Sequence, residues 1–461
     1  MKVTPPPQRL PLSGMTPEFI MDYLVEYRLK GTPYLHYDQL KRRIRDPEKL
    51  LSFWQHIVMA RRISATQLPL LHIRTSNSSA RYCIPRINVT ALIQKSCSVV
   101  DRLTSSAAQT ERYEKFDAAD YLMDELTLAE AIASSQLEGA ATTSRVALEM
   151  LKVGRMPRDE GEKMIMGNFR MMNYVSERGN APFSVEEIQT LHRVAIEGIS
   201  DDKYLPGQLR TVSDNVVVAD HQGNVIHTPP DADRLPEALE RLCTFINTPH
   251  ETAEDETYLH PLVKACIIHF MIGYLHPFKD GNGRTARALF YWYMLKCGYT
   301  AFRYISISKL LKNAPAKYVR AYLYSETDEM DLTYFVNYQC EIVSRAVEEY
   351  LDFIQQFIHT RVELRAWLYD SGIFSQINAR QRDLAAIAIN QPGILFTAAE
   401  VCARMGVSEN TAREDLKKLT ALGLMKAMKE GKGNVYLSPR NMHELKKWRG
   451  KNDKTASAQD W

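Results

Sequence analysis

Twelve residues, HPFKDGNGRTAR at positions 276–287, constrain this chain more than any other part of it. Gly281, Asn282 and Gly283 are residue types that tolerate positive φ and let a ligand approach the main chain. Successive N–H groups in such a turn form an anion-binding nest. A helical apolar pattern follows at once, over residues 285–292. The nest is therefore predicted to lie at a helix N-terminus, where the helix dipole adds positive potential.

The charged residues of the same segment suit chemistry on a bound phosphate. Arg284 and Arg287 are three residues apart on the predicted helix, so both can face one side and offer planar guanidinium groups to phosphate oxygens. Asp280 stands just before the nest and would repel phosphate unless Mg²⁺ lay between them. His276 follows an apolar run and has an ordinary pKa near neutrality, so it can accept a proton there. Each residue alone fits a turn, a helix end or a solvated face, but the combination favours a phosphate site.

The segment matches every defined position of HPFx(D/E)GNGRxxR and so resembles the signature of the Fic family. The resemblance implies a mainly α fold, with a Fic-type helical core and a β-hairpin flap. It also implies a nucleotidyltransferase that moves AMP from ATP to a Tyr, Ser or Thr hydroxyl of a protein, with ATP and Mg²⁺ as cofactors.

The resemblance also assigns roles to single residues. His276 would deprotonate the target hydroxyl, and Asp280 would hold Mg²⁺. Gly281, Asn282 and Gly283 would bind the α- and β-phosphates, Arg284 the outer phosphates and Arg287 the γ-phosphate, and Lys279 is grouped with these nucleotide-binding residues. A kinase-like branch of the family carries Lys at the position of Gly283, so the glycine favours AMP transfer over phosphorylation.

A second segment, residues 127–152, has helical apolar spacing and contains Ser134, Glu138 and Gly139. These three residues resemble the inhibitory motif of the family, (S/T)xxxE(G/N). Ser134 and Glu138 are spaced i, i+4 and so share one helix face. The resemblance implies that Glu138 forms a bidentate pair with Arg287 and occupies the donors that the γ-phosphate needs. An ordinary surface pair is the alternative.

A hairpin is expected between these two segments. Residues 204–210, YLPGQLR, supply the GxxR element of the family, and alternating residues at 216–218 and 225–228 flank a turn at 221–224. The family has a flap here, whose backbone pairs with the target segment. Candidate target-binding residues are Val225, Ile226 and His227. A purely structural hairpin is the alternative.

The C-terminal region, residues 376–445, resembles a winged helix-turn-helix domain. Thr397 to Glu400 form a capping box that opens one helix, and Ser408 caps a second helix that stops at Gly423. Short strands are predicted at 424–429 and 435–438.

The charged residues of this domain support two different interpretations of its function. Between residues 380 and 451 there are fourteen Lys and Arg but seven Asp and Glu, and this excess of positive charge favours phosphate contacts. The candidate recognition helix nevertheless carries Glu409, Glu414 and Asp415, which would repel DNA unless they face away. DNA binding and a protein-contact or dimerisation role both stay open.

Whole-chain properties agree with a multidomain protein of 461 residues and net charge +3. Seven scattered cysteines indicate reduced thiols, the first residues lack the apolar core of a signal peptide, and the apolar run at 265–275 is too short to span a bilayer. We therefore expect a cytoplasmic protein without a membrane partner. Pro47 should break the basic helix at 38–63. The expected divisions are a mostly helical region at 1–110, a Fic core at 111–350, a helical linker at 351–375, the winged helix at 376–445 and a polar tail at 446–461.

Two functional classes follow. The leading one is a protein adenylyltransferase restrained by Glu138. Its partners would be a hydroxyl-bearing protein, which could be the chain itself, and DNA at the winged helix, with a homodimer also considered. The alternative is a DNA-binding transcription regulator whose core only senses nucleotide, although His276 favours the enzyme because a sensor needs no base. An enzyme that removes AMP or transfers another phosphate-linked group remains open.

Overall fold

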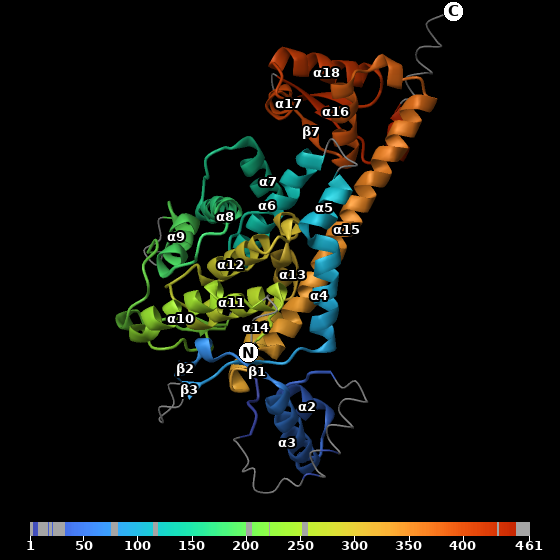
Figure 1. Ribbon diagram of the computed structural model, residues 1–461. Coiled ribbons are helices and arrows are strands. Elements are labelled where there is room, and N and C mark those ends of the chain that lie inside the picture. The colour runs from blue at the N-terminus through green and yellow to red at the C-terminus, as the bar shows by residue number, and fades with distance from the viewer. Residues whose placement is uncertain are drawn as a thin grey trace, which may run out of the picture. The chain divides into compact units, whose positions relative to one another are not determined.

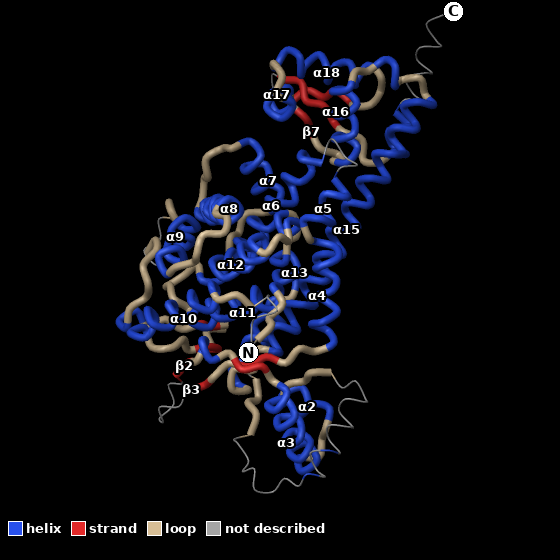
Figure 2. Tube along the Cα trace, in the orientation of Figure 1, coloured by secondary structure: helices blue, strands red, loops and turns tan. Residues whose placement is uncertain are grey.

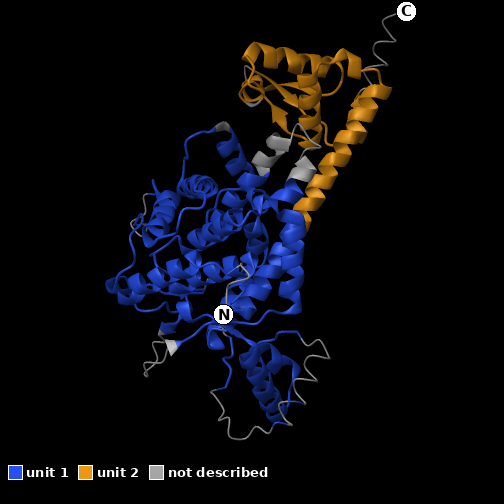
Figure 3. Cartoon of the chain, viewed as in Figure 1, with its two compact units in different colours: residues 1–111, 126–347 blue, residues 112–125, 348–461 orange. Residues whose placement is uncertain are grey.

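The computed structural model describes residues 3–7, 17, 21, 33–74, 82–113, 119–199, 205–220, 222–250, 257–430 and 433–448. Helices dominate these residues (Figures 1 and 2), which confirms the mainly α architecture. The chain forms two compact units (Figure 3), residues 1–111 with 126–347 and residues 112–125 with 348–461. Within the part of the chain just specified, no helix combines the length and apolarity needed to cross a membrane.

Two helices, α11 (Pro261–Leu275) and α12 (Asn282–Lys296), lie side by side at the centre of the first unit (Figure 1). Nearly every side chain of α11 is buried, as expected for a helix that is apolar on all sides. His260 caps its N-terminus through its ring and Pro261 occupies the first turn. The short turn that joins α11 to α12, residues 276–281, carries the first half of the Fic-like signature, and the start of α12 carries the second half.

Other helices surround this pair. Helices α8 (Glu160–Glu177) and α9 (Val185–Ile196) pack on α12, and α10 (Leu235–Asn247) packs on α11. The remaining elements as far as residue 370 are α2 (Tyr37–Arg43), α3 (Pro47–Ser64), β1 (Thr66–Gln67), η2 (Pro69–Leu71), β2 (Ile73–Arg74), β3 (Tyr82–Cys83), β4 (Arg86–Ile87), α4 (Ala91–Thr104), α5 (Ser106–Tyr113), α6 (Ala119–Leu137), α7 (Ser144–Val153), η3 (Val212–Asp214), β5 (Val218–Ala219), β6 (Val225–His227), η4 (Ala232–Arg234), η5 (Thr300–Arg303), α13 (Ile307–Asn313), α14 (Pro315–Thr327) and α15 (Thr333–Asp370).

The predicted break at Pro47 is confirmed. Helix α2 ends at Arg43, and α3 begins at Pro47 after Asp46, whose carboxylate accepts bonds from two backbone N–H groups of the new helix. Proline at the first position of a helix loses no hydrogen bond, because its N–H would have no partner there.

The expectation of helical structure throughout residues 127–152 is wrong at one place. Helix α6 ends at Leu137, and α7 starts only at Ser144, capped by Thr143. Gly139 adopts φ 99°, and Ala140 N–H bonds back to the carbonyl of Ser135, which closes the end of α6. Apolar spacing continues across the break, so periodicity alone could not reveal it. Glu138 therefore lies just beyond the helix rather than within it.

The predicted hairpin is confirmed, although its strands are shorter than expected. Strands β5 and β6 pair antiparallel, Val218 opposite His227 and Ala219 opposite Val225, with a register shift between Val218 and Ala219. The carboxylate of Asp220 accepts bonds from the backbone N–H groups of Gln222 and Asn224 and so shapes the turn.

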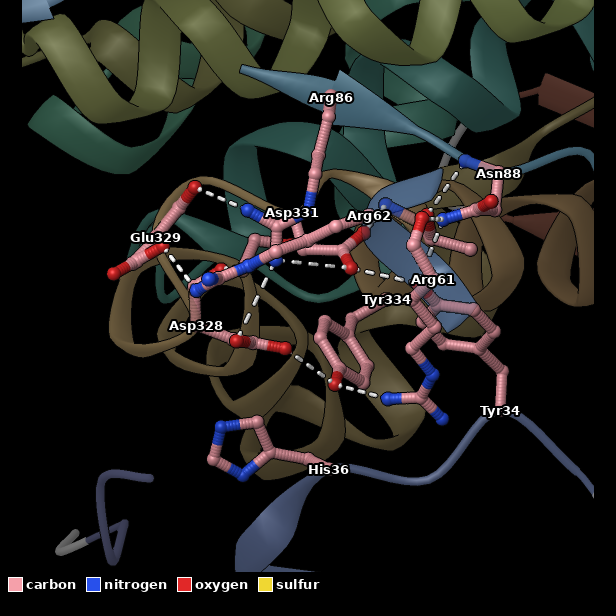
Figure 4. A network of polar contacts seen from close by, with 12 residues as sticks. Tyr34, His36, Arg61, Arg62, Arg86, Asn88, Asp328, Glu329, Asp331 and Tyr334 are labelled. Atoms are coloured by element: carbon pink, nitrogen blue, oxygen red, sulfur yellow. Dashed lines mark hydrogen bonds and ion pairs between the residues drawn. The ribbon is translucent and has the colours of Figure 1, made fainter. Parts of the chain in front are cut away.

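A buried polar network fastens the N-terminal part of this unit to the junction of α14 and α15 (Figure 4). The Arg86 guanidinium donates to the backbone carbonyls of Asp328 and Glu329, both at 3.0 Å, and lies 3.4 Å from the carboxylate of Asp331. Tyr34 donates to the same Asp331 carboxylate at 2.6 Å. Burial, with Asp331 adding to it, raises the pKa of Asp328 to about 6. The network therefore depends on the positive charge that Arg86 brings to two buried acids.

The second unit contains the expected winged helix. Its elements are η6 (Phe374–Gln376), α16 (Ala379–Asn390), β7 (Leu395–Phe396), α17 (Ala398–Met405), α18 (Glu409–Ala421), β8 (Lys426–Glu430) and β9 (Gly433–Leu437). The strands form an antiparallel sheet in the order β7-β9-β8, and β7 was not anticipated. Thr397 and Ser408 cap α17 and α18 as predicted, and Leu416, Leu419 and Tyr436 contribute to the buried core.

We predict that Arg86→Met lowers the free energy of unfolding of this unit by about 3–5 kcal/mol, because Asp328 and Asp331 would stay buried without their cation. Urea denaturation measures the change. The control is Arg62→Met, since Arg62 pairs with Glu329 at 2.6 Å while both side chains are about one-third exposed. An exposed pair contributes at most about 1 kcal/mol. Equal, small losses in the two variants would contradict the assignment.

Candidate active site

The turn between α11 and α12 has a backbone that few residues adopt. His276 ends α11 with φ 48°, and Gly281 precedes α12 with φ 84°. Both are left-handed conformations, which cost little for glycine and more for histidine. The side chain of Asn282 accepts a bond from the N–H of Phe278 and donates one to its carbonyl, at 2.9 and 2.8 Å. The side chain of Asn282 thus closes the loop, while its main chain forms the first residue of α12.

The ring of His276 is half-buried, and burial lowers its pKa to about 4. Its Nδ1 lies 3.3 Å from the carbonyl oxygen of Gly273. A carbonyl can only accept, so this contact places the proton on Nδ1 and leaves the lone pair on Nε2. The imidazole is therefore neutral near pH 7 and can act as a proton acceptor through Nε2.

Arg210, from the GxxR element, holds the same turn by its backbone. Its Nε donates to the carbonyl of His276 at 2.7 Å, and Nη2 donates to the carbonyls of Leu275 and Pro230. Its own N–H donates to the carbonyl of Pro277 at 2.8 Å. These bonds use the guanidinium to satisfy backbone oxygens, so Arg210 supports the site rather than facing a ligand.

Asp280 and the N-terminus of α12 form the anion-facing part. The Asp280 carboxylate accepts a bond from Gly281 N–H at 2.6 Å and is half-buried. Among the described residues, no group of three or more His, Cys, Asp or Glu side chains could hold a metal ion. Mg²⁺ carried by a nucleotide needs only one or two protein carboxylates, because phosphates and water complete its shell. Asp280 beside the nest fits that requirement.

The two signature arginines are fully buried. Arg284 donates from Nη1 to the carbonyl of Ala195 at 3.2 Å, which ties its side chain to the end of α9. Arg287 donates from Nε to the hydroxyl of Ser134 at 2.8 Å, and from Nη2 to the carbonyl of Ser134 at 3.1 Å.

Glu138 does reach Arg287. Its Oε1 lies 2.8 Å from Nη2 of Arg287, but only this one nitrogen bonds to it, so the expected bidentate pair is wrong. Nε, which a side-on bidentate pair would use together with Nη2, is engaged by Ser134. Burial lowers the pKa of Arg287, but Glu138, Tyr318 and Glu130 together more than offset this, so the pKa is raised.

The same carboxylate lies against the first turn of α12. A Cβ atom added to Gly283 would come within 2.1 Å of Oε1 of Glu138. No side chain can therefore stand at Gly283 while Glu138 is in this position. A carboxylate is thus placed where the positive end of the helix dipole favours an anion.

Helix α6 carries a buried acid, Glu130, eight residues before Glu138. It accepts bonds from the hydroxyls of Ser306 and Ser308 and from the N–H of Ser308. Burial raises the pKa of Glu130, and these donors oppose the rise. Glu130 holds α6 against the start of α13 and was not identified from the sequence.

Residues near the flap have mixed roles. Lys279 forms an ion pair with Asp214 at 2.7 Å, which holds the pKa of Asp214 at about 2. The side chain of Val225 is exposed and that of Ile226 is partly exposed, whereas His227 is buried. The ring of His227 contacts the carbonyl of Tyr274 at 2.8 Å and Glu326 at 2.9 Å. Its side chain therefore anchors the flap and does not face outward.

His192 is the main site residue that sequence reasoning missed. Its Nε2 donates to the carbonyl of Asp280 at 2.8 Å, and Gly207 N–H donates to its Nδ1 at 3.1 Å. Burial lowers its pKa to about 4. The available signal was its place in the buried stripe of α9 with Leu191 and Ala195. A polar ring in that stripe needs buried partners.

Comparisons with known proteins agree with this geometry. Residues 182–294 match the Fic/DOC family, and residues 386–431 match the DeoR-like helix-turn-helix domain. The protein adenylyltransferase Fic of Drosophila yakuba is 27% identical over 125 residues, which cover 27% of this chain and 23% of that protein. The corresponding protein of Culex quinquefasciatus is 27% identical over 133 residues, covering 29% and 24%. The chain thus spans about a quarter of the length of these curated relatives.

Two solved structures are also similar. A Fic family protein from Desulfovibrio desulfuricans G20 is 18% identical with a TM-score of 0.47, covering 75% of this chain and 94% of that one. Fic-1 from C. elegans is 20% identical with a TM-score of 0.44, covering 57% and 72%. From the matched residues and the geometry of the turn, the chain carries a Fic/DOC family domain at residues 182–294, followed by a DeoR-like helix-turn-helix domain at residues 386–431.

Proposed function

We propose that this protein is an adenylyltransferase that moves AMP from ATP to a Tyr, Ser or Thr hydroxyl of a protein, and that Glu138 holds it in an inhibited state. The observation that carries the proposal is the turn between α11 and α12. It places the proton-accepting ring of His276 at one end and the anion-facing N-terminus of α12 at the other. A hydroxyl and a triphosphate can meet within this one loop.

The transfer step needs one proton acceptor and a set of groups that stabilise the negative charge of the phosphates. Nε2 of His276 takes the hydroxyl proton, the hydroxyl oxygen forms a bond to the α-phosphorus, and the bond from that phosphorus to the β-phosphate oxygen breaks. Pyrophosphate leaves with the electron pair. General-base action of this kind contributes about 10²–10⁴-fold to the rate. The N–H groups at the start of α12 and the charge of Arg284 stabilise the phosphates.

Asp280 would hold Mg²⁺, which when bound neutralises phosphate charge. The flap would bind the target by β-augmentation, with its backbone as the pairing edge and the exposed Val225 as an apolar contact. His227 and Glu326 fix the base of the flap. The target is thereby presented next to His276, because His227 also bonds to the carbonyl of Tyr274, two residues before it.

Inhibition follows from the position of Glu138. Its carboxylate bonds to Arg287 and lies against Gly283, where the resemblance places the γ-phosphate and the nest. Two anions cannot share these donors, so ATP is kept out of the transfer-ready pose. A hydrogen bond to a charged group contributes roughly 1.5–3 kcal/mol, which corresponds to about ten- to a hundredfold in binding.

A DNA-binding role for the winged helix is the second proposal, and it rests on α18. Asp415 is buried and bonded to Arg380 and Gln381, so it faces the interior of the domain. The exposed acids of α18 are each paired with a base: Glu409 with Arg413, and Glu414 with Lys417. The three acids of α18 should therefore repel DNA much less than their number in the sequence suggested. A protein contact is the alternative, and a homodimer and a cytoplasmic location stay predictions.

We predict that Glu138→Gly raises transfer of AMP by roughly ten- to a hundredfold, because Arg287 and Gly283 become accessible to phosphate. Intact mass after incubation with ATP and Mg²⁺ reports one added AMP per modified site. Glu149→Ala is the control, as it removes an exposed carboxylate from the neighbouring helix α7. An unchanged rate in Glu138→Gly would overturn the inhibitory role. Transfer of a phosphate instead of AMP would assign the other chemistry of the family.

In the Glu138→Gly background, we expect His276→Ala to lose about 10²–10⁴-fold in transfer while its affinity for ATP stays unchanged. Calorimetry measures binding and labelled ATP measures transfer. The result separates the enzyme from a nucleotide sensor, since a sensor would not need the base. Equal label in both proteins would exclude catalysis through His276.

For the winged helix, we expect binding to duplex DNA whose affinity falls steeply with salt. Arg413→Gln and Lys417→Gln should each weaken binding and reduce the salt slope by about 1. Lys446→Gln is the control, because Lys446 is not part of α18 and pairs with Glu363 of α15. Fluorescence anisotropy at several salt concentrations tests this. Absence of salt-dependent binding would favour the protein-contact role.

A further inference from the structure

We propose that His192 is a positioning residue that sets the direction of the peptide group between Asp280 and Gly281, and so keeps the nest open to phosphate. The proposal deepens the proposed function, since it concerns the same nucleotide site. His192 lies on α9, is 1% exposed, and would touch no substrate itself. It acts through the backbone of the loop.

The hydrogen bonds of the ring define its tautomer without reference to titration. An amide N–H can only donate and a carbonyl can only accept. Because Gly207 N–H points at Nδ1 and the Asp280 carbonyl receives Nε2–H, the ring must carry its single proton on Nε2. Gly207 therefore orients His192, and His192 orients Asp280. Arg210, three residues after Gly207, holds the carbonyl of His276 at the other end of the loop.

Steric contacts restrict the ring further. It stacks on Phe278 with ring centroids 3.7 Å apart and planes at 2°. A Cβ atom added to Gly281 would stand 3.0 Å from Nε2 of His192. The ring is therefore packed against both the middle and the end of the loop, and a small movement of either would be transmitted to it.

The consequence concerns the peptide group itself. The C=O and N–H of a trans peptide point in opposite directions. With the carbonyl of Asp280 bonded to His192, the N–H of Gly281 points the other way, toward the carboxylate of Asp280. Gly281 tolerates either sign of φ, so the group can turn over once the bond to His192 is lost. The oxygen would then replace the hydrogen that now holds the carboxylate of Asp280, so this carboxylate would have to move, and the oxygen beside the nest would repel a phosphate.

Two variants separate this role from simple core packing. His192→Gln keeps one acceptor and one donor on a side chain of similar reach, whereas His192→Leu fills the space without either. His192→Asn is polar but too short to reach both partners, and replaces His192→Leu if that protein does not fold. His260→Leu is the matched control, because His260 is also a buried histidine and caps the opposite end of α11.

The first readout needs no nucleotide. Hydrogen–deuterium exchange of the peptide covering residues 277–283 should quicken at least tenfold in His192→Leu or His192→Asn, remain near the parent rate in His192→Gln, and be unaffected by His260→Leu. Unchanged exchange in both disruptive variants overturns the proposal whatever the protein catalyses.

The second readout is ATP affinity in the Glu138→Gly background, measured by calorimetry in EDTA and again with Mg²⁺. We expect the dissociation constant to rise about tenfold or more in His192→Leu under both conditions, with His192→Gln recovering most of the affinity. In transfer assays the loss should appear in KM for ATP rather than in kcat. ATP binding equal to that of the parent overturns the proposal. A parent that binds ATP but transfers nothing would refute the proposed function while leaving the test of His192 intact.

Discussion

The turn between α11 and α12 is held by its carbonyl oxygens. Arg210 bonds to the carbonyls of Leu275 and His276, and His192 bonds to that of Asp280. Buried carbonyl oxygens need donors inside the protein, and these side chains supply them. The turn is thereby held in the conformation that places His276 just before the N-terminus of α12, where the helix dipole favours an anion. The supporting residues come from α9 and from the segment that follows it, so the site depends on how these pack on α12.

Arg287 connects the start of α12 to Ser134 and Glu138. A cation removed from water must keep an anion or several acceptors near it. Ser134 supplies two acceptors and Glu138 supplies the charge. A phosphate oxygen in place of the Glu138 carboxylate would leave the charge balance almost unchanged. In the proposed mechanism, the form restrained by Glu138 and the nucleotide-bound form are therefore close in energy, and a modest bias selects between them.

Local sequence predicted those features whose cause is local. The signature segment contains its own turn formers, its own helix start and its own acid and base, so His276, Asp280 and Gly281 could be placed from residue types alone. The caps at Thr397 and Ser408 and the break at Pro47 have the same local origin.

Features that depend on distant partners could not be predicted in this way. His192 meets the loop across 88 residues of sequence. The inward direction of Asp415 depends on Arg380, on another helix. The single rather than double bond between Glu138 and Arg287 arises because Ser134 competes for the guanidinium. In each case the residue type was visible in the sequence, but the neighbour that decides its role was not.

The position of Glu138 outside α6 has a consequence for how the proposed restraint can end. The side chain stands on the irregular stretch 138–143, after the last turn of the helix and before the cap of the next one. Withdrawing it would rearrange a few backbone torsions near Gly139, while Glu130 and Ser134 keep their places on intact helix. No helical turn has to melt, so the barrier to release is that of a loop movement, which is compatible with microsecond switching.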